Sequence, residues 1–455
     1  MLLLCNDEHP PERRPASPTW GSGTGMTTGP VTVVGERPRL LFLCQTLPYP
    51  PNGGANIRTY HVLRLLAREF EIDALCFYRQ SYRMDREAVA AGVEGLRPFA
   101  RVEPFPIPQE SHSGRLLWDH ARSLASGRAY TMYAYDSSAF RNRVRELLAS
   151  RRYAVAHVDS LDLAGYLPML RGLPTICVHH NLESLLLARR ARGERSVWRR
   201  AYLGLQARLL ARTERVWCPQ VALNVVVSDA DGRRLKSLAP GAAVSVVPNG
   251  VDVTAFRPES GREHGLVFVG GSNWFPNRDS LEYFCQEILP HIRRRCGDVT
   301  VRWVGQCTDD DKRHYRDRFG IELTGYVPDV RPLVRDAACY IVPMRVGGGT
   351  RLKILDAWAM GKAVVSTSAG SEGLAVADGV NILTRDDPEA FADGVRTVLA
   401  EKALRTRLGQ GGRETAEQCY SWEVIGDGML QTYQKLCGTR RGPRAAGSGR
   451  VRVEA

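Results

Sequence analysis

A glycine-rich segment at residues 343–361 has the residue types that bind phosphate. A short apolar run ends at Pro343, three glycines follow at 347–349, and Thr350 can cap a helix that Gly361 ends. A glycine loop between a strand and a helix presents backbone N–H groups and the positive end of the helix dipole to an anion. The spacing therefore predicts a phosphate site that includes the loop residues Gly348, Gly349 and Thr350.

Two cations, Arg351 and Lys353, stand at the predicted start of this helix. Positive charges in the first turn of a helix oppose its dipole, and a bound diphosphate would resolve that conflict. Residues two positions apart do not share a helix face, so we expect only one of the two to reach the diphosphate directly, or Arg351 to lie in the cap. The alternative is a structural glycine turn in which Lys353 pairs with Asp356.

The elements that must position this segment form two successive α/β series. Short apolar runs, as expected for parallel strands covered on both faces, alternate with segments of helical spacing. In the first series we expect strands at 40–44, 72–78, 155–158, 175–179, 224–228 and 244–247. In the second we expect them at 266–269, 299–304, 321–324, 339–342, 364–367 and 381–383. Residues 100–140 carry no pattern that predicts an element.

Two such series imply an α/β protein with two doubly wound, Rossmann-like domains facing a cleft. We place the N-terminal domain at 38–258 and the C-terminal domain at 259–419, with a helix at 420–437 that crosses back to the first. Pro, Gly, Ser and Thr dominate residues 1–37, which predicts a disordered leader and leaves open whether Met1 or Met26 is the start. Residues 438–455 are expected to form a disordered basic tail.

Composition narrows the classes of function. The sequence contains no long uncharged apolar stretch and no signal-peptide core, so we expect a cytoplasmic protein. Its 11 cysteines are scattered and odd in number, which argues against a disulfide framework or a zinc site. The net charge of +13 suits nucleoside diphosphates or an anionic membrane surface. Nucleic acid is not expected as a partner, because the sequence contains no nucleic-acid-binding motif.

The glycine-rich segment, together with others in the same order, resembles the donor site of family 4 retaining glycosyltransferases, which have the two-domain GT-B fold. The resemblance spans residues 38–437, and its motifs are specific as an ordered set rather than singly. The matching segments are PPNGG at 50–54, VHHNLE at 178–183, VPNGVD at 247–252, VFVG at 267–270, WVG at 303–305, TGYVPDV at 324–330, GKAVVST at 361–367 and EGL at 372–374.

The resemblance implies roles for particular residues. Gly53 and Gly54 would place backbone N–H groups near the donor phosphates or the acceptor. His180, in preference to His179, would contact the donor sugar and its developing charge. The diphosphate would be held by Arg351 and its neighbours, and the catalytic set would be His180, Arg351 and Lys353. The implied donor-binding set is Gly53, Gly54, Gly270, Val327, Gly348, Gly349, Thr350, Arg351, Leu352, Lys353 and Asp356.

The sequence departs from the family pattern at three places. Asp356 replaces the usual Glu whose carboxylate binds the ribose hydroxyls, and Asp is one methylene shorter. Gly348 stands where the family has another Glu, which puts sugar recognition in doubt. An Arg/Lys pair expected after the strand at 266–269 is not evident, so its role falls to Arg351 and Lys353, with Arg278 as a further candidate.

The acids at 309–311, Glu183 and the Arg-rich segment 189–215 can each be interpreted in two ways. The acids at 309–311 form an Asp-x-Asp pattern, but acids also favour a helix N-terminus, and we expect helix capping and no metal or cofactor. We expect Glu183 to cap a helix or to pair with Arg189 or Arg190. Segment 189–215 holds nine Arg and two Glu. It is either an amphipathic surface that docks on anionic lipid or a helix that packs on its own domain.

The predicted function is therefore retaining transfer of a hexosyl group from a UDP- or GDP-linked sugar to a hydroxyl of a glycan or lipid-linked acceptor. Exopolysaccharide or cell-envelope glycan synthesis, with contact to the inner face of a membrane, would fit by family analogy. One alternative is a nucleotide-sugar epimerase, which needs carboxylates around the sugar and is disfavoured by Gly348. The other is a non-catalytic nucleotide- or glycan-binding protein, which the presence of Arg351, Lys353 and His180 disfavours.

Overall fold

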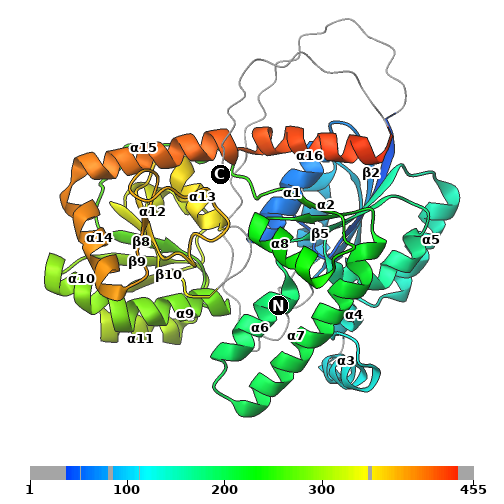
Figure 1. The fold of residues 1–455 in the computed structure, drawn as a ribbon, viewed down its shortest axis with the longest axis horizontal. Coiled ribbons are helices and arrows are strands. Elements are labelled where there is room, and N and C mark those ends of the chain that lie inside the picture. Colours follow the sequence, from blue (N-terminus) through cyan, green and yellow to red (C-terminus); the bar gives the residue numbers. More distant parts are fainter. Residues whose placement is uncertain (1–36, 52, 80–85, 112, 347–350, 439–455) are drawn as a thin grey trace, which may run out of the picture.

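The structure, a computed structural model, describes residues 37–51, 53–79, 86–111, 113–346 and 351–438. Within these residues the chain forms two separate sheets, each flanked by helices (Figure 1). Almost all of the predicted leader and basic tail lies outside the described residues. The same is true of the predicted loop residues Gly348, Gly349 and Thr350.

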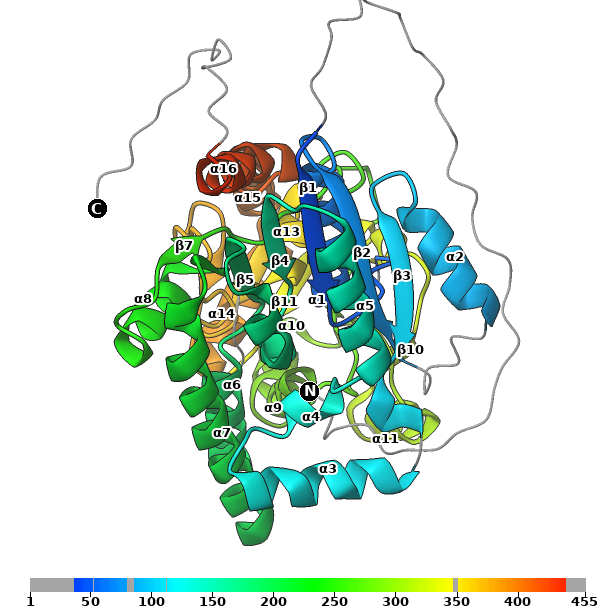
Figure 2. The same ribbon diagram turned by 90° about the vertical axis from the view of Figure 1, so that its right-hand side faces the viewer.

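The first sheet has seven parallel strands in the order β3-β2-β1-β4-β5-β6-β7. Figure 2 shows β3, β2, β1, β4 and β5 side by side. This order, in which the chain reverses direction between β1 and β4, defines a doubly wound fold. The strands are β1 (Arg39–Cys44), β2 (Glu71–Tyr78), β3 (Arg101–Pro106), β4 (Val155–Val158), β5 (Thr175–His179), β6 (Leu223–Val226) and β7 (Val244–Val246).

The second sheet repeats the pattern with six parallel strands in the order β10-β9-β8-β11-β12-β13. Here the reversal lies between β8 and β11, so the predicted class of two Rossmann-like domains is confirmed. The strands are β8 (Leu266–Val269), β9 (Val301–Val304), β10 (Glu322–Gly325), β11 (Cys339–Val342), β12 (Val364–Ser366) and β13 (Leu383–Thr384).

Helices cover both faces of each sheet, which is why most strands are buried along their whole length. With the first sheet come α1 (Gly54–Leu66), α2 (Arg86–Leu96), α3 (Ser113–Ser126), α4 (Thr131–Ala134), α5 (Ser138–Ser150), α6 (Glu183–Gly193), α7 (Val197–Trp217) and α8 (Asp229–Leu238). With the second come α9 (Phe275–Tyr283), α10 (Leu289–Cys296), α11 (Asp309–Phe319), α12 (Arg331–Arg335), α13 (Leu352–Ala359), α14 (Pro388–Ala400) and α15 (Lys402–Cys419); the last helix is α16 (Trp422–Leu436).

Strand β3 is the strand that the sequence did not predict. It pairs with β2 alone among the described strands, and it contains Pro104 and Pro106. Proline cannot donate a ladder hydrogen bond, so it occurs in sheets mainly on edge strands. The two prolines are compatible with the edge position of β3, and they also hide the strand from a search for long apolar runs.

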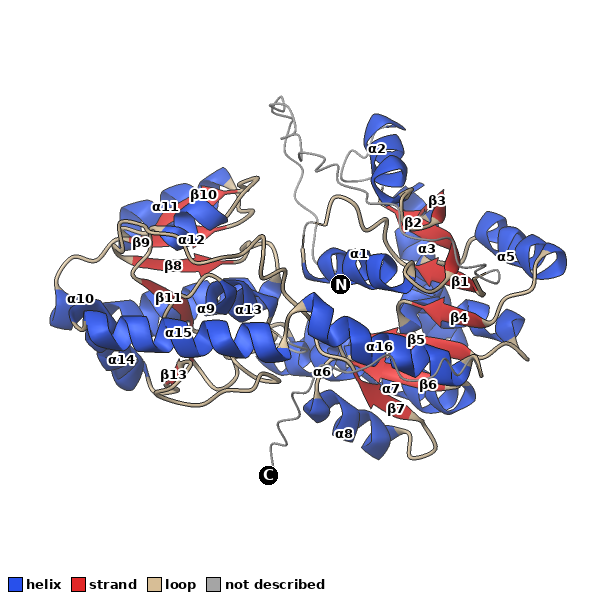
Figure 3. Cartoon of the chain, turned by 90° about the horizontal axis from the view of Figure 1, so that it is seen from above, coloured by secondary structure: helices blue, strands red, loops and turns tan. Residues whose placement is uncertain are grey.

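The last helix, α16, lies over the first sheet although the chain reaches it from the second. Figure 3 shows α15 beside the second sheet and α16 continuing over the strands of the first. The apolar face of α16, including Trp422, Met429 and Tyr433, joins the same buried cluster as residues of β1 and α1. The core of the first domain is therefore completed by the end of the chain.

The two segments that connect the domains run side by side. Val251 N–H donates to Tyr420 O (2.8 Å), and Trp422 N–H donates to Val251 O (3.3 Å). The indole of Trp422 stacks on His61 of α1, with ring centroids 4.7 Å apart. Arg58 of α1 donates to Val247 O and to Asn249 Oδ1, both at 2.9 Å. These contacts fix both connections to the first domain.

Replacement of Gly250 by Ala should destabilise these connections. A Cβ atom at this position would lie 2.5 Å from the Trp422 ring, so the indole would have to move. We expect the free energy of unfolding to fall by about 1–3 kcal/mol, measured as a lower midpoint of thermal unfolding. Gly204→Ala in α7 is the control, because nothing lies within 4 Å of its added Cβ. Equal midpoints for the two variants would contradict tight packing at Gly250.

Candidate active site

Several of the predicted site residues lie at the points where the strand order reverses in each sheet. In the first sheet, Gly53 and Gly54 follow β1, and Asp159, which the sequence did not predict, follows β4. In the second, Gly270 follows β8, and Arg351 follows β11 after the undescribed loop. In doubly wound folds, ligands bind outside the carboxyl ends of the strands at such reversal points.

The N-termini of α1 and α13 meet between the two domains. Gly53 occupies the N-cap of α1 with φ of 92°, a conformation that favours glycine. A Cβ atom on Gly54 would lie 3.3 Å from Leu352 Cδ1 at the start of α13. Neither helix has a side-chain hydrogen bond at its N-cap. Two sets of uncapped N–H groups, one from each domain, are thus brought close together.

Arg351 rather than Thr350 occupies the N-cap of α13, and the helix begins at Leu352. This is the cap position that the sequence left open for Arg351. As expected for residues two positions apart, the two cationic side chains diverge. The Arg351 guanidinium donates to Ala369 O (3.0 Å), whereas the Lys353 ammonium donates to Asn277 Oδ1 (2.8 Å).

Arg351 is buried among groups from both domains. Its side chain is 4% exposed and lies 3.8 Å from the carboxylate of Glu372. Glu372 also pairs with Arg189 of α6, at 3.1 Å. Arg189 therefore pairs with a residue of the second domain. Burial, only partly offset by Glu372, lowers the pKa of Arg351 to about 10, so the group stays charged at neutral pH.

Lys353 is held by residues of β8 and of the start of α9. Its ammonium lies 3.9 Å from the centre of the Phe268 ring and bonds to Asn277 rather than to Asp356. Burial, followed by the charge of Arg351, lowers the pKa of Lys353 well below its usual range. Gly270 is part of the same arrangement, because a Cβ atom there would lie 2.7 Å from the Asn277 amide.

Asp356 lies one turn further along α13, partly buried. Burial raises the pKa of its carboxyl group to about 7. At neutral pH the carboxyl is therefore divided between its two protonation states and can accept or donate a hydrogen bond. This is compatible with the ribose contact that the resemblance implies, which stays a prediction.

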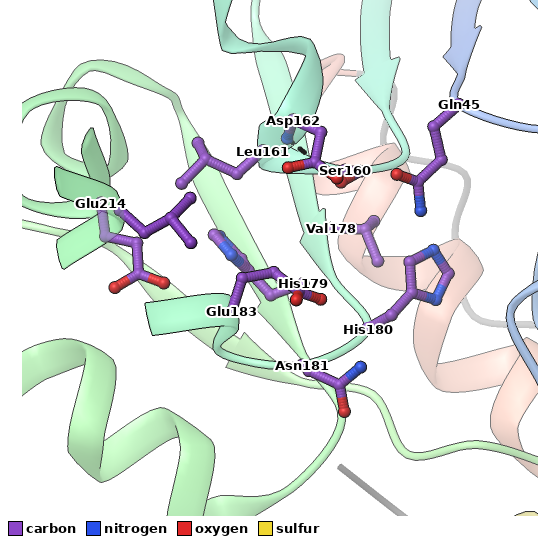
Figure 4. A pocket seen from close by; sticks show the side chains of 11 residues that line it. Gln45, Ser160, Leu161, Asp162, Val178, His179, His180, Asn181, Glu183 and Glu214 are labelled. Carbon is purple, nitrogen blue, oxygen red and sulfur yellow. Dashed lines mark hydrogen bonds between the residues drawn. The ribbon is translucent and has the colours of Figure 1, made fainter. Parts of the chain in front are cut away.

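His180 lines a pocket at the carboxyl edge of the first sheet (Figure 4). Its Nε2 lies 3.3 Å from Asp159 Oδ2. The neighbouring His179 has a structural environment instead, since it is buried and contacts Asn224 Oδ1 at 3.0 Å. The other lining residues are Gln45, Ser160, Leu161, Asp162, Val178, Asn181, Glu183, Leu210 and Glu214.

Glu183 is the first residue of α6, so the predicted position at a helix start is correct. Burial, followed by the charge of Asp162, raises the pKa of Glu183 to about 7. Burial also raises the pKa of Asp162 and of Glu214. This side of the pocket therefore carries less negative charge at neutral pH than three carboxyl groups would suggest.

The remaining predicted residues lie around the second sheet. Val327 follows β10 and packs, partly buried, against the second core. Arg278 of α9 pairs with Asp311 (3.1 Å). The acids at 309–311 form the first turn of α11, and the Thr308 hydroxyl at its N-cap accepts from Asp311 N–H (3.0 Å), which confirms the helix-start interpretation.

Sequence reasoning missed the residues that hold the predicted ones in place. Asp159 contacts His180, Asn277 holds Lys353, and Glu372 contacts Arg351. A signal for Asp159 was present, because a carboxylate that directly follows a buried strand lies at the ligand-binding edge of the sheet. Glu372 lies in the EGL segment at 372–374, but its contact with Arg351, like that of Asn277 with Lys353, depends on the folding of distant segments.

Comparison with known proteins agrees with a two-domain α/β protein in which each domain has loops at the point where its strand order reverses. The sequence profile "Glycosyltransferase Family 4" matches residues 52–255, and the profile "Glycosyl transferases group 1" matches residues 263–401. The two matches together span most of the chain. The protein belongs to the family 4 glycosyltransferases, and the resemblance inferred from its motifs is confirmed.

Two relatives illustrate the range of the family. The chain is 27% identical over 234 residues to the phosphatidyl-myo-inositol mannosyltransferase of Mycobacterium tuberculosis, an alignment that covers 48% of this chain and 60% of the mannosyltransferase. It is 24% identical over 430 residues to the alpha-maltose-1-phosphate synthase of the same organism, with 86% and 98% covered.

Solved structures share the fold. The sucrose-phosphate synthase of Thermosynechococcus elongatus superposes with a TM-score of 0.67 at 16% identity, covering 88% of this chain and all of that one. Anabaena HepE in complex with UDP gives a TM-score of 0.60 at 14% identity, covering 87% of this chain and 100% of that one. These likenesses establish that the two sheets form a GT-B fold.

Replacement of Asp356 by Asn should change how stability depends on pH. The pKa of Asp356 is raised in the folded state, so the unfolded state binds fewer protons between about pH 4 and pH 7. Wild type should therefore lose stability relative to Asp356→Asn as the pH rises through this window. Because the side chain is partly exposed, we expect a relative loss of about 1–3 kcal/mol rather than the full value of the shift.

Urea denaturation of the ligand-free protein at several pH values measures this difference. The control is Asp427→Asn on the exposed face of α16. Its free energy of unfolding should change with pH in the same way as that of wild type. A difference between wild type and Asp356→Asn that stays constant from pH 4 to pH 7 would show that Asp356 does not resist ionisation.

Proposed function

We propose that this protein transfers a hexosyl group from a nucleotide-diphosphate sugar to a hydroxyl acceptor, between an acceptor domain at 38–258 and a donor domain at 259–419. The observation that carries the proposal is the meeting of the α1 and α13 N-termini beside Arg351 and Lys353. Helix N-termini and buried cations together are complementary to a diphosphate.

The proposed donor site uses these groups before and during bond cleavage. Arg351, Lys353 and the N–H groups of the α13 start would bind the diphosphate, with Gly348, Gly349 and Thr350 in the preceding loop. As the glycosidic bond breaks, negative charge accumulates on the diphosphate, and preorganised cations and dipoles stabilise it. We propose that this stabilisation needs no metal ion. Gly270 supports Lys353 through Asn277, and Val327 and Asp356 complete the nucleoside side.

The reaction itself would take place between Gly53–Gly54 and His180. A His180 contact to the donor sugar would stabilise the charge that develops on it as the leaving group departs. The family resemblance implies that the anomeric configuration is retained, with a donor phosphate oxygen assisting deprotonation of the acceptor hydroxyl. This course requires no nucleophile from the protein.

Relatives suggest which donors to test first. The Anabaena HepE structures contain UDP, glucose and UDP-glucose, which makes a UDP-linked hexose the first candidate. GDP-linked hexoses are the second, as the sequence leaves the base open. The mannosyltransferase relative acts on phosphatidyl-myo-inositol by its name, and it motivates a lipid-linked acceptor. Synthesis of an exopolysaccharide or cell-envelope glycan is the pathway that we propose.

One nucleoside diphosphate among UDP, GDP, ADP and dTDP should raise the midpoint of thermal unfolding. Binding to the folded state stabilises it by about 2.7 kcal/mol at a nucleotide concentration 100 times Kd. In Arg351→Ala/Lys353→Ala the shift should disappear. Arg396→Ala/Lys402→Ala, which removes exposed cations around the α14–α15 junction, should keep it. Absence of a shift with all four nucleotides would contradict the transferase and favour a glycan-binding protein.

Turnover separates the three candidate functions. A transferase consumes donor slowly without acceptor and faster with it, an epimerase interconverts donors without acceptor, and a binding protein does neither. We expect acceptor-dependent turnover that His180→Ala lowers about 100-fold while nucleotide binding is kept. Product analysis by NMR then tests retention. Full turnover in His180→Ala would exclude the proposed role of His180.

We also propose that the protein contacts an anionic membrane through the α3–α7 surface, defined as α3, the α6–α7 turn and the outer face of α7. Figure 2 shows α3 crossing beside α7, and Gln206 Nε2 donates to Ser123 Oγ (2.9 Å) between them. Trp198 is 86% exposed and Trp118 is 62% exposed. The segment from the α6–α7 turn through α7 also carries exposed arginines: Arg195, Arg199, Arg200, Arg208, Arg212 and Arg215.

Both interpretations of the Arg-rich segment find support in this arrangement. Leu203, Ala207 and Leu210 pack α7 onto its own domain, while the arginines face outward. Exposed aromatic side chains next to cations are typical of surfaces that bind anionic bilayers. Among the described residues no helix is long and apolar enough to cross a bilayer.

The wild-type protein should sediment with vesicles that contain phosphatidylglycerol but not with pure phosphatidylcholine, and salt should weaken the association. Trp118→Ser/Trp198→Ser and Arg199→Gln/Arg200→Gln/Arg208→Gln should each reduce sedimentation about ten-fold. The controls are Val380→Ser and Arg316→Gln/Arg318→Gln on the second domain, where side chains of the same kinds are exposed. Equal sedimentation of test and control variants would exclude this surface.

A further inference from the structure

A buried chain of polar side chains runs from the last helix to His180. The Tyr433 hydroxyl of α16 lies 2.6 Å from His157 Nδ1, and His157 Nε2 lies 3.2 Å from Asp159 Oδ1. The other carboxylate oxygen of Asp159 lies 3.3 Å from His180 Nε2. Four side chains from α16, β4 and the loops after β4 and β5 are thus connected in series.

The three members behind His180 are shielded from solvent. Tyr433, His157 and Asp159 are each 1% exposed or less, and His157 stacks on Phe42 at 4.0 Å. Buried polar groups are costly unless they are paired, so their mutual contacts define their orientations. The chain therefore has little freedom to rearrange.

The protonation states along the chain follow from the environment. Burial favours the neutral form of Asp159, but the nearby His180 and His157 outweigh it and hold the pKa of this carboxyl well below its usual range. Burial lowers the pKa of His157, which keeps this imidazole neutral. A neutral ring that donates from Nε2 to a carboxylate must accept at Nδ1, and the Tyr433 hydroxyl is the donor there.

Asp159 is also fixed from the side of α1. The Thr59 hydroxyl donates to Asp159 Oδ2 (2.6 Å), and the Cys44 thiol approaches the same oxygen at 3.5 Å. Arg58, one residue before Thr59, adds a buried positive charge nearby. The carboxylate that faces His180 is thus held by α1, β1, β4 and, through His157, α16.

We propose that Tyr433, His157 and Asp159 are positioning residues for His180. Through its 3.3 Å contact with Nε2, the Asp159 carboxylate orients the His180 ring, and Tyr433 and His157 keep Asp159 in the orientation to do so. This inference rests on the proposed role of His180 in sugar transfer, and it makes the last helix part of the catalytic arrangement.

Loss of the Tyr433 hydroxyl shows how the chain would act. Without it, His157 Nδ1 becomes a buried acceptor with no donor, and the ring loses the contact that fixes its plane on the side of α16. The ring and the Asp159 carboxylate that its Nε2 contacts would then be held less firmly in their orientations. His180 would lose its fixed partner although no residue in contact with the substrate had changed.

The test compares Tyr433→Phe and Asp159→Asn with wild type in the full-length chain. We expect kcat to fall about five-fold in Tyr433→Phe, the factor for one buried hydrogen bond, and about 10- to 100-fold in Asp159→Asn. The donor KM and nucleotide Kd should stay within two-fold of wild type. Tyr166→Phe is the matched control, since it removes a buried hydroxyl that donates to Tyr135 O (2.6 Å) outside the chain.

A second readout does not depend on turnover. In ¹⁵N-histidine-labelled protein, ¹H–¹⁵N correlation spectra report which ring nitrogen carries the proton. We expect the Nε2-protonated tautomer for His157 in wild type and Tyr166→Phe, and shifted ring resonances of His157 and His180 in Tyr433→Phe. Should Tyr433→Phe not fold, His157→Gln provides the same comparison at His180.

The two readouts separate the possible failures. Unchanged His180 ring resonances together with unchanged kcat in Tyr433→Phe and Asp159→Asn would overturn the positioning role. Equal losses of kcat in Tyr433→Phe and Tyr166→Phe, with unchanged spectra, would reduce it to general stability and also overturn it. If wild type transfers no sugar at all, the proposed function fails, and the histidine spectra alone decide whether the chain orients the His180 ring.

Discussion

The packing of α16 against α1 is the interaction on which the arrangement of the site depends. Trp422 stacks on His61 at the start of this contact, and Tyr433 reaches the buried strand β4 at its end. Because the chain enters α16 directly from the second domain, this contact ties the α13 N-terminus to the α1 N-terminus. The start of α13, with the proposed donor-binding groups, then faces the glycine turn of the other domain.

Groups of the protein offset only part of the positive charge of Arg351 and Lys353 at this junction. Arg351 and Lys353 are buried cations at the start of a helix, where the dipole opposes them. Glu372 offsets Arg351, and the Phe268 ring and Asn277 support Lys353. Burial therefore still lowers the pKa of both groups. The proposed diphosphate would add negative charge to that of Glu372 and Asp231.

The sequence predicted the strands that are buried along their whole length, but it did not predict contacts between residues that lie far apart in the chain. The strands β4, β5, β8 and β11 have the predicted bounds, because strands covered on both faces read as apolar runs. Edge strand β3 did not show this pattern. Arg351 and Lys353 were found from a local conflict between charge and helix dipole. Asp159 and Asn277 were not, since their partners lie tens of residues away and only the fold brings them together.

The position of α16 also has a consequence for synthesis of the chain. Domains at the N-terminal end of a protein commonly fold while the rest is still being translated. Here one face of the first sheet, with Ile176 and Val225 among its apolar residues, joins the same buried cluster as side chains of α16, which are translated after the second domain. The nascent first domain must keep this face exposed until translation passes residue 433, so its folding is completed only after the second domain has left the ribosome.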